Sequence, residues 1–174
     1  MSELQSIIDW YEYNSFVRRR YLKAIFEKIP EEERHRDRGT SFPSIVDIFV
    51  HVLDDYRFWF QYVYAGNIAG FRKLRGETRF AFERLAEEND MIDRFVLNFV
   101  RDLKPGDLGK EISAEGRRYG TVVRFDLRQM LLHMIEEELQ HRGEMNALFW
   151  QIDIDPPVTE YMDWIYAKSR GLLQ

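Results

Sequence analysis

The sequence contains no cysteine. This excludes a disulfide framework, a thiolate metal site and a cysteine nucleophile. The sequence also lacks any apolar run close to the roughly 18 residues that a membrane-spanning helix needs. Its first residues, MSELQSIIDWYEYNS, lack the basic and apolar regions of a signal peptide. We therefore expect a cytoplasmic protein with no membrane partner.

The sequence also has no excess of positive charge: 25 Lys and Arg residues and 30 Asp and Glu residues give a net charge of -5. Non-specific nucleic-acid binding needs a net basic face, so we expect no nucleic-acid partner. Large side chains are plentiful instead, with an aromatic fraction of 15% in 174 residues. A chain of this length and composition can form one domain, 1–174, around a core of large side chains.

Apolar residues recur at helical spacing in four long segments and one short segment. Ser41 or Ser44 can cap the second segment, with Pro43 in its first turn, and the segment ends near Gly66. Two β-like runs around Glu115–Gly116 predict a small hairpin before the fourth helix. The remaining helices are expected over 3–28, about 79–103, 126–150 and 159–170. The fold class is therefore all-α, a four-helix bundle with a short C-terminal helix and a small β-hairpin.

The fourth helix carries a polar pair on its apolar face. Glu137 and His141 are one turn apart, about 6 Å along the axis, with methionines before and after them. A buried carboxylate must be neutralised, paired or bound to a metal, because an unpaired buried charge costs too much free energy. His133 lies one turn before Glu137 but about 12 Å from His141, so all three cannot bind one ion. The helix offers Glu137 with His141, which we prefer because the pair is nearer the apolar centre line, or His133 with Glu137.

A third ligand can come from His51, in the middle of the second helix. Asp55 follows it by one turn and could be a fourth ligand or orient its imidazole. His51, Glu137 and His141 then form a set of two histidines and a carboxylate, which suits one divalent ion of zinc, iron, nickel or manganese. Plainer roles also fit these residues: His51 as a hydrogen-bonded core histidine and Glu137 in a salt bridge.

Two stretches resemble the DinB-like (YfiT-like) metalloenzyme family. They are YNSFVRRRYLKAIFEKIPEEE…TSFPSIVDIFVHVLDDYRFWF and YGTVVRFDLRQMLLHMIEEELQHRGEMNALFWQIDIDPP, the second of which contains the triplet His-Arg-Gly of the family's closing motif. The resemblance covers about residues 10–157. It implies a four-helix bundle, usually a homodimer, in which one histidine of the second helix and two of the motif helix hold a divalent ion. The matching positions are His51, Glu137 and His141.

The chain departs from the family pattern at two positions of the motif helix. Glu137 stands in place of the first motif histidine, and Glu144 in place of a closing glutamine. A carboxylate ligand lowers the net positive charge of a metal site compared with a third histidine. The ion is then a weaker Lewis acid, and the pKa of its bound water is higher. Harder ions are also favoured. Alternatively, Glu137 marks a degenerate site that no longer binds metal.

The family's characterised relatives are transferases and isomerases in which the metal binds a low-molecular-weight thiol. The resemblance therefore implies a metal-dependent transferase or hydrolase that activates a thiol or water for reaction with a small-molecule substrate. Asp55, Glu138, Arg142 and His133 are candidates for residues that surround the ligands. Arg142 could bind an anionic substrate group or form a salt bridge, and Glu144 is a candidate general base.

A metal-free function is the alternative. The bundle would then bind a ligand or partner in an aromatic cavity lined by residues such as Trp59, Tyr62 and Trp150. Substitution of His141 separates the two hypotheses. It should abolish metal binding under the first and change only stability under the second.

Overall fold

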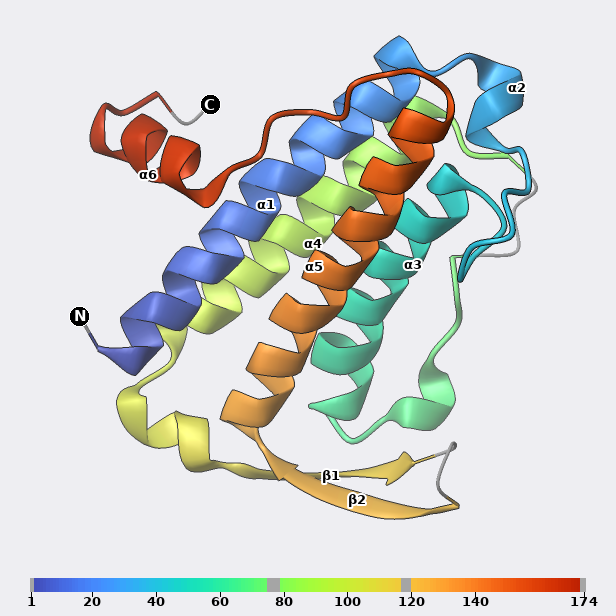
Figure 1. Cartoon of the computed structure of the whole chain (residues 1–174). Helices are drawn as coiled ribbons and strands as arrows, with labels where there is room; N and C mark the ends of the chain where they lie inside the picture. The colour runs from blue at the N-terminus through green and yellow to red at the C-terminus, as the bar shows by residue number, and fades with distance from the viewer. Residues whose placement is uncertain (1, 75–78, 117–119, 173–174) are drawn as a thin grey trace.

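The computed structural model describes residues 2–74, 79–116 and 120–172. Four long helices form a bundle (Figure 1). They are α1 (Glu3–Lys28), α3 (Ile45–Arg57), α4 (Phe82–Asp102) and α5 (Leu127–Gln151). The helical spacing of the apolar residues therefore predicted the all-α bundle correctly.

Shorter elements connect the long helices and extend the bundle. They are α2 (Glu31–Arg34), the π-helical turn η1 (Phe58–Val63), the 3-10 turns η2 (Ile68–Gly70) and η3 (Pro105–Gly109), the strands β1 (Glu111–Gly116) and β2 (Thr121–Asp126), and α6 (Tyr161–Ser169). The two strands pair antiparallel, with Gly116 opposite Thr121. The predicted hairpin is thus present, but Glu115 and Gly116 belong to its first strand rather than to its turn.

Side-chain caps fix the starts of α3 and α5, the helices that carry the predicted ligands. Ser44 Oγ accepts a hydrogen bond from Asp47 N at 3.2 Å, and Asp126 Oδ1 accepts one from Gln129 N at 2.7 Å. Asp126 and Gln129 also complete a reciprocal capping box. Of the two predicted caps for α3, Ser44 is the one observed. Pro43 precedes this cap and does not lie in the first helical turn.

The predicted second helix changes its hydrogen bonding after Arg57. The turn η1 is π-helical, with Tyr64 N bonded to Trp59 O at 3.0 Å. Each π turn holds one more residue than an α turn, so the side chains that follow are rotated about the helix axis. Trp59 lies edge-on to His133 of α5, with 5.0 Å between the ring centroids.

The core lies between the four long helices and is rich in aromatic side chains, as the composition predicts. Tyr11, Phe49, Tyr56 and Phe60 are each no more than 2% exposed. Outside the bundle, α6 packs against α1 (Figure 1), and its Trp164 is fully buried. Among the residues that the structure describes, no helix is both long enough and apolar enough to cross a membrane.

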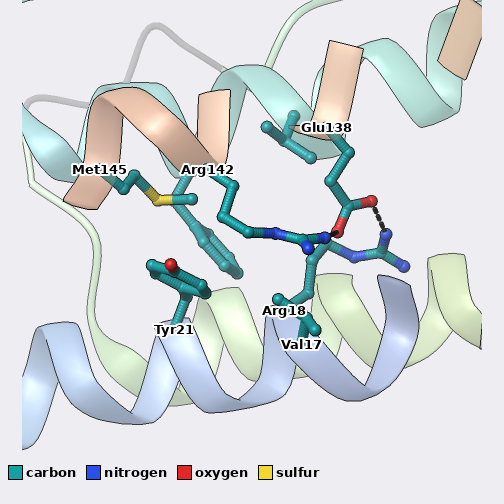
Figure 2. Close-up of a pocket in the computed structure, with 8 residues that line it drawn as sticks. Val17, Arg18, Tyr21, Glu138, Arg142 and Met145 are labelled. Carbon is teal, nitrogen blue, oxygen red and sulfur yellow. Dashed lines mark hydrogen bonds and ion pairs between the residues drawn. The ribbon is translucent and has the colours of Figure 1, made fainter. Parts of the chain in front are cut away.

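A network of charged side chains crosses this core between α1, α4 and α5. Arg18 of α1 donates a hydrogen bond at 2.5 Å to Glu138 Oε2 of α5 (Figure 2) and pairs with Asp93 of α4. Tyr56 of α3 donates a second hydrogen bond to Glu138 Oε2, at 2.6 Å. Buried charges of this kind are tolerated only when they are paired and hydrogen-bonded. The network therefore ties four helices together through a few specific contacts.

Candidate metal centre

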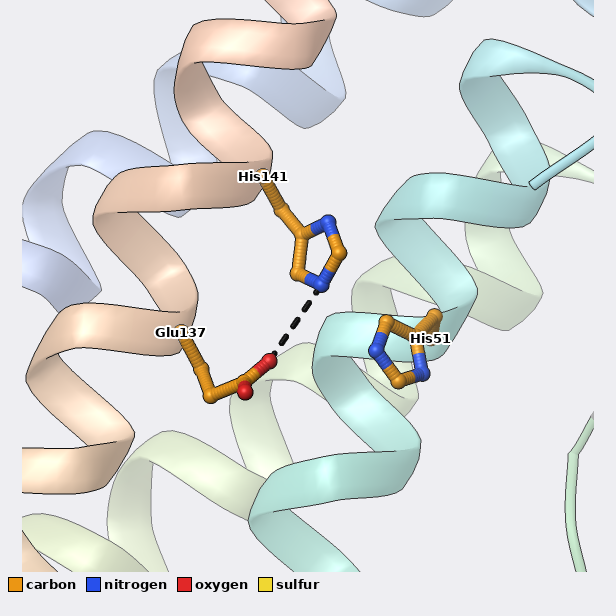
Figure 3. A group of neighbouring side chains, drawn as sticks. All are labelled: His51, Glu137 and His141. Atoms are coloured by element: carbon orange, nitrogen blue, oxygen red, sulfur yellow. Dashed lines mark ion pairs between the residues drawn. The ribbon is translucent and has the colours of Figure 1, made fainter. Parts of the chain in front are cut away.

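His51 of α3 and the pair Glu137 and His141 of α5 face one another between the two helices (Figure 3). One potential ligand atom of each residue lies within 4.8 Å of those of the other two. His141 Nε2 is 3.4 Å from Glu137 Oε2, and the two imidazole rings lie at 88° with centroids 4.6 Å apart. The fold thus brings together the three residues to which the sequence pointed.

The three side chains lie at the edge of the core. His141 is 3% exposed, whereas the side chains of His51 and Glu137 are 17% and 25% exposed. A metal site that acts on a substrate needs an open coordination position as well as fixed ligands. The partial exposure of His51 and Glu137 lets water or a small molecule reach the three donor atoms. His141, by contrast, is held in the core.

Each imidazole also contacts a carboxylate of its own helix. Glu144 Oε2 is 2.9 Å from His141 Nδ1, and Asp55 Oδ2 is 3.1 Å from His51 Nε2. Such contacts fix the tautomer and the orientation of metal-binding histidines. Asp55 is not among the donor atoms that converge within 4.8 Å, so this contact favours its predicted role of orienting His51 over that of a fourth ligand. From the sequence we expected Glu144 only as a candidate base, although its i, i+3 spacing from His141 could have indicated this contact.

The loop before α3 covers part of the group. The ring of Phe42 lies over that of His51 with centroids 4.0 Å apart, and edge-on to His141 at 5.5 Å. Next to it, Ser41 Oγ donates a hydrogen bond to Glu144 Oε2 at 2.6 Å. An apolar wall lowers the local dielectric constant and so strengthens electrostatic interactions at the donor atoms. No motif in the sequence indicated these two contacts, because they depend on how the loop packs.

Glu137 lies between two histidines of its own helix. Its Oε1 is 3.8 Å from His133 Nε2, while its Oε2 faces His141. His133, Glu136 and Glu137 form a second group of donor atoms within 4.8 Å of one another. Both pairs that the helix spacing offered are therefore present. The pair with His141 gains a third donor from a facing helix, whereas the pair with His133 gains only Glu136, whose side chain is 64% exposed.

Glu138 and Arg142, which we expected around the ligands, are directed elsewhere. They are 2% and 7% exposed and turn into the core towards α1, where Tyr56 of α3 also donates to Glu138. Arg142 donates hydrogen bonds to Tyr13 at 2.8 Å and to Asn14 at 3.0 Å. One residue step rotates a helix by about 100°, so residues that directly follow the ligands point to another side. Of the two roles predicted for Arg142, its burial and contacts match the structural one.

Gly143 completes the His-Arg-Gly triplet and faces outward. It is exposed, and a Cβ added at this position would meet nothing within 4 Å. A glycine within a helix often marks close packing. Among the described residues, no such packing partner lies against Gly143.

The aromatic cavity considered for a metal-free protein is not formed by the residues that we named for it. Trp59 packs edge-on to His133, near the start of α5. Trp150 is 60% exposed, and the helix rises by about 25 Å between His133 and Trp150. Tyr62 packs against Phe71 instead. Trp150 is therefore too far from Trp59 for the two to line one pocket.

The three donor residues, His51, Glu137 and His141, fall within a match to a known family. The family model of the DinB superfamily matches residues 15–145. The chain belongs to the DinB superfamily. It is also similar to Protein DinB of Bacillus subtilis (strain 168), with 23% identity over 157 residues, which cover 87% of this chain and 88% of the relative. The family resemblance seen in the sequence is thereby confirmed.

Proposed function

We propose that this DinB-superfamily protein binds one divalent metal ion through His51, Glu137 and His141. In this proposal the protein is a metal-dependent transferase or hydrolase that activates a thiol or water for reaction with a small-molecule substrate. The supporting observation is the convergence of three donor atoms from two helices within 4.8 Å. Two imidazoles and one carboxylate suit zinc, iron, nickel or manganese.

The distances around His141 support its role as a ligand. Two ligand atoms that each lie about 2.1 Å from one tetrahedral ion are about 3.4 Å apart. His141 Nε2 and Glu137 Oε2 are separated by 3.4 Å, whereas His141 Nδ1 and Glu144 Oε2 are at the hydrogen-bond distance of 2.9 Å. One nitrogen of the imidazole is therefore placed as a ligand atom would be, and the other as the donor to an orienting carboxylate.

A divalent ion at this position would supply a Lewis acid that lowers the pKa of a bound thiol or water. The residues around the ion would determine how far that pKa is lowered. Glu137 adds a negative charge that a third histidine would not, and this favours harder ions. Phe42 keeps water from one side of the two imidazoles. Because its Oε2 is engaged by both His141 and Ser41, we assign Glu144 to positioning rather than to proton abstraction.

We extend the proposal to a low-molecular-weight thiol as co-substrate and to a homodimer, both of which the family resemblance implies. We also propose a cytoplasmic location, as we expected from the sequence. The chain has no cysteine, so any thiol that reacts at the site must come from outside it. Thiol binding can be measured by calorimetry on metal-loaded protein, and self-association by sedimentation equilibrium. Either extension can fail without contradicting metal binding.

Metal content tests the central proposal. Protein without a histidine tag, purified without chelators, is expected to carry about one ion per chain by elemental analysis. His141→Ala and Glu137→Ala should both lose it, because each removes a ligand. His35→Ala and Glu87→Ala are matched controls, since both residues lie outside the donor group, and they should keep it.

Two other results would change the assignment. Metal kept by Glu137→Ala but lost by His141→Ala would make the histidines the anchor and the glutamate incidental. A wild-type protein that carries no metal, and takes up none from a panel of divalent ions, would contradict the proposal. It would favour the metal-free alternative, in which the bundle binds a ligand or partner and the site is degenerate.

A further inference from the structure

A second group of donor atoms lies on α5, one turn before the candidate metal centre. It consists of His133, Glu136 and Glu137, each of which offers one ligand atom within 4.8 Å of those of the other two. Residues three and four positions apart are neighbours on the surface of a helix, so their side chains can reach one point. Exposed carboxylates often cluster without binding an ion, and the charge and geometry of this group therefore matter more than its proximity.

The two carboxylates of this group have no cationic side chain to balance them. Among the residues that the structure describes, neither Glu136 nor Glu137 pairs with a lysine or an arginine, and their ion-pair contacts are with histidines of α5. Glu138, the next residue, is paired with Arg18 instead. The group thus combines an imidazole with two negative charges that a divalent cation can neutralise.

The imidazole of His133 is held in place on one side. Trp59 lies edge-on to it with ring centroids 5.0 Å apart, and Trp59 in turn packs against Phe125 of β2. The side chain of His133 is nevertheless 38% exposed, so an ion in solution can reach its nitrogen atoms. A ligand that is ordered before binding loses less freedom when the ion arrives.

Glu137 directs its two oxygens towards two different histidines. Its Oε2 is 3.4 Å from His141 Nε2 (Figure 3), and its Oε1 is 3.8 Å from His133 Nε2. Two atoms that bind one ion at about 2.2 Å lie no more than about 4.4 Å apart, so both distances fit a shared ion. The histidines are too far apart for one ion, but a carboxylate can bind a separate ion through each oxygen, as in two-metal sites.

We propose that a second divalent ion binds to His133, Glu136 and Glu137. Glu137 bridges it to the ion held by His51 and His141. This bridge rests on the proposed function, whereas the second ion itself needs only the three side chains of α5. One imidazole and two carboxylates suit zinc, which takes three protein ligands and leaves a position for water.

The second ion is bound more weakly than the first. The side chains of His133 and Glu136 are 38% and 64% exposed, so binding must order groups that solvent leaves mobile. Two cations that share one carboxylate also repel each other. The second position is therefore empty at low free zinc, and after purification in metal-free buffer, and it fills as the zinc concentration rises.

A zinc titration of untagged, chelator-treated protein tests the proposal, with bound ions counted after equilibrium dialysis at fixed free zinc. The wild type is expected to hold one ion per chain at low free zinc and two when free zinc is at least about 10-fold higher. His133→Ala should stop at one ion, because it removes the imidazole of the second site only. His35→Ala is the matched control, since His35 lies outside both donor groups, and it should reach two.

Reciprocal variants separate this proposal from the proposed function. His141→Ala should lose the tightly bound ion and keep the weakly bound one, whereas Glu137→Ala should lose both. A wild type that saturates at one ion, which His141→Ala removes, would overturn the second site. A second ion kept by His133→Ala would overturn it too, because that ion would lie elsewhere. A single ion that depends on His133 and not on His141 would instead contradict the proposed function and support this site.

Discussion

His141 has a carboxylate near each of its ring nitrogens, Glu144 at Nδ1 and Glu137 at Nε2. A neutral imidazole donates from only one nitrogen, and its other nitrogen carries a lone pair. If Nδ1 donates to Glu144, the lone pair of Nε2 faces the oxygen of Glu137. Two electron-rich atoms in that arrangement repel each other unless a proton or a metal ion lies between them. A divalent ion at Nε2, as proposed, would remove this repulsion.

Glu144 should matter to metal affinity although it is not a proposed ligand. Glu144→Ala removes the acceptor at Nδ1, so the imidazole can rotate, and we expect the affinity for zinc to fall by about 10- to 100-fold. Glu144→Gln keeps an acceptor oxygen and should lose less. Competition with a chromophoric chelator measures both.

The exposed Glu136 on the same helix provides the control for charge alone. Glu136→Ala removes one negative charge without touching the imidazole of His141, and it should leave the zinc affinity nearly unchanged. If Glu136→Ala and Glu144→Ala weaken binding equally, the effect of Glu144 is general electrostatics, and its role in orienting His141 is wrong.

At the scale of elements, α5 is buried on two sides for different reasons. One side presents Glu137 and His141 to α3, and the other presents Glu138 and Arg142 to the core. Although burial alone lowers the pKa of Arg18, the neighbouring anion of Glu138 raises it overall, so Arg18 stays charged. The ion pair between Arg18 and Glu138 is therefore a buried, charged link between α1 and α5.

Arg18→Met tests this link between the helices. It leaves Glu138 and Asp93 as buried carboxylates without their main cationic partner, so we expect the free energy of unfolding to fall by about 3–5 kcal/mol. Its neighbour Arg19 also pairs with Asp93, at 3.2 Å, but its side chain is 50% exposed. Arg19→Met should cost no more than about 1 kcal/mol, because solvent screens the pair.

Denaturation by urea measures both variants. Equal losses for Arg18→Met and Arg19→Met would show that burial of the ion pair does not set its contribution. Unchanged slopes of free energy against urea concentration would confirm that both variants still unfold in one step from a similarly compact state.

The sequence predicted the long elements better than the side to which each polar residue turns. Helical spacing placed the first helix at 3–28, where α1 is found, and the fourth within a residue of the bounds of α5. The π-helical turn after α3 was missed because its residues have no local signature. Glu138 was expected to lie around the ligands, because periodicity did not show that the side of α5 next to Glu137 is buried as well. Their difference depends on Arg18, which lies 120 residues away from Glu138 in the chain.

For the whole molecule, buried tyrosines predict a loss of stability at high pH. Burial raises the pKa of Tyr56, and the nearby anion of Glu138 raises it further. The pKa of Tyr11 is raised chiefly by burial, and further by the neighbouring Tyr56 and Glu138. The folded state thus keeps protons that the unfolded state releases near pH 10. Their contribution to stability is complete below about pH 10 and is lost as the pH rises towards the folded pKa values.

The free energy of unfolding should therefore fall steadily above about pH 10. Urea denaturation between about pH 8 and pH 11 measures the slope, and absorbance of tyrosinate reports how many hydroxyls have ionised at each pH. Tyr56→Phe is expected to make the slope shallower, because one of the raised pKa values is removed. Tyr166, which is 60% exposed, is the control, and Tyr166→Phe should leave the slope unchanged. A slope that is the same in all three proteins would contradict this assignment.

The outward-facing Gly143 can distinguish the properties of one chain from those of an assembly. In an isolated chain Gly143→Ala should raise the free energy of unfolding by about 1 kcal/mol, because alanine favours helix and has free space at this position. If a second copy packs against the bare backbone here, the added methyl group would instead weaken self-association. The substitution would then raise the melting temperature measured at low protein concentration. It would lower the association constant measured by sedimentation at high concentration.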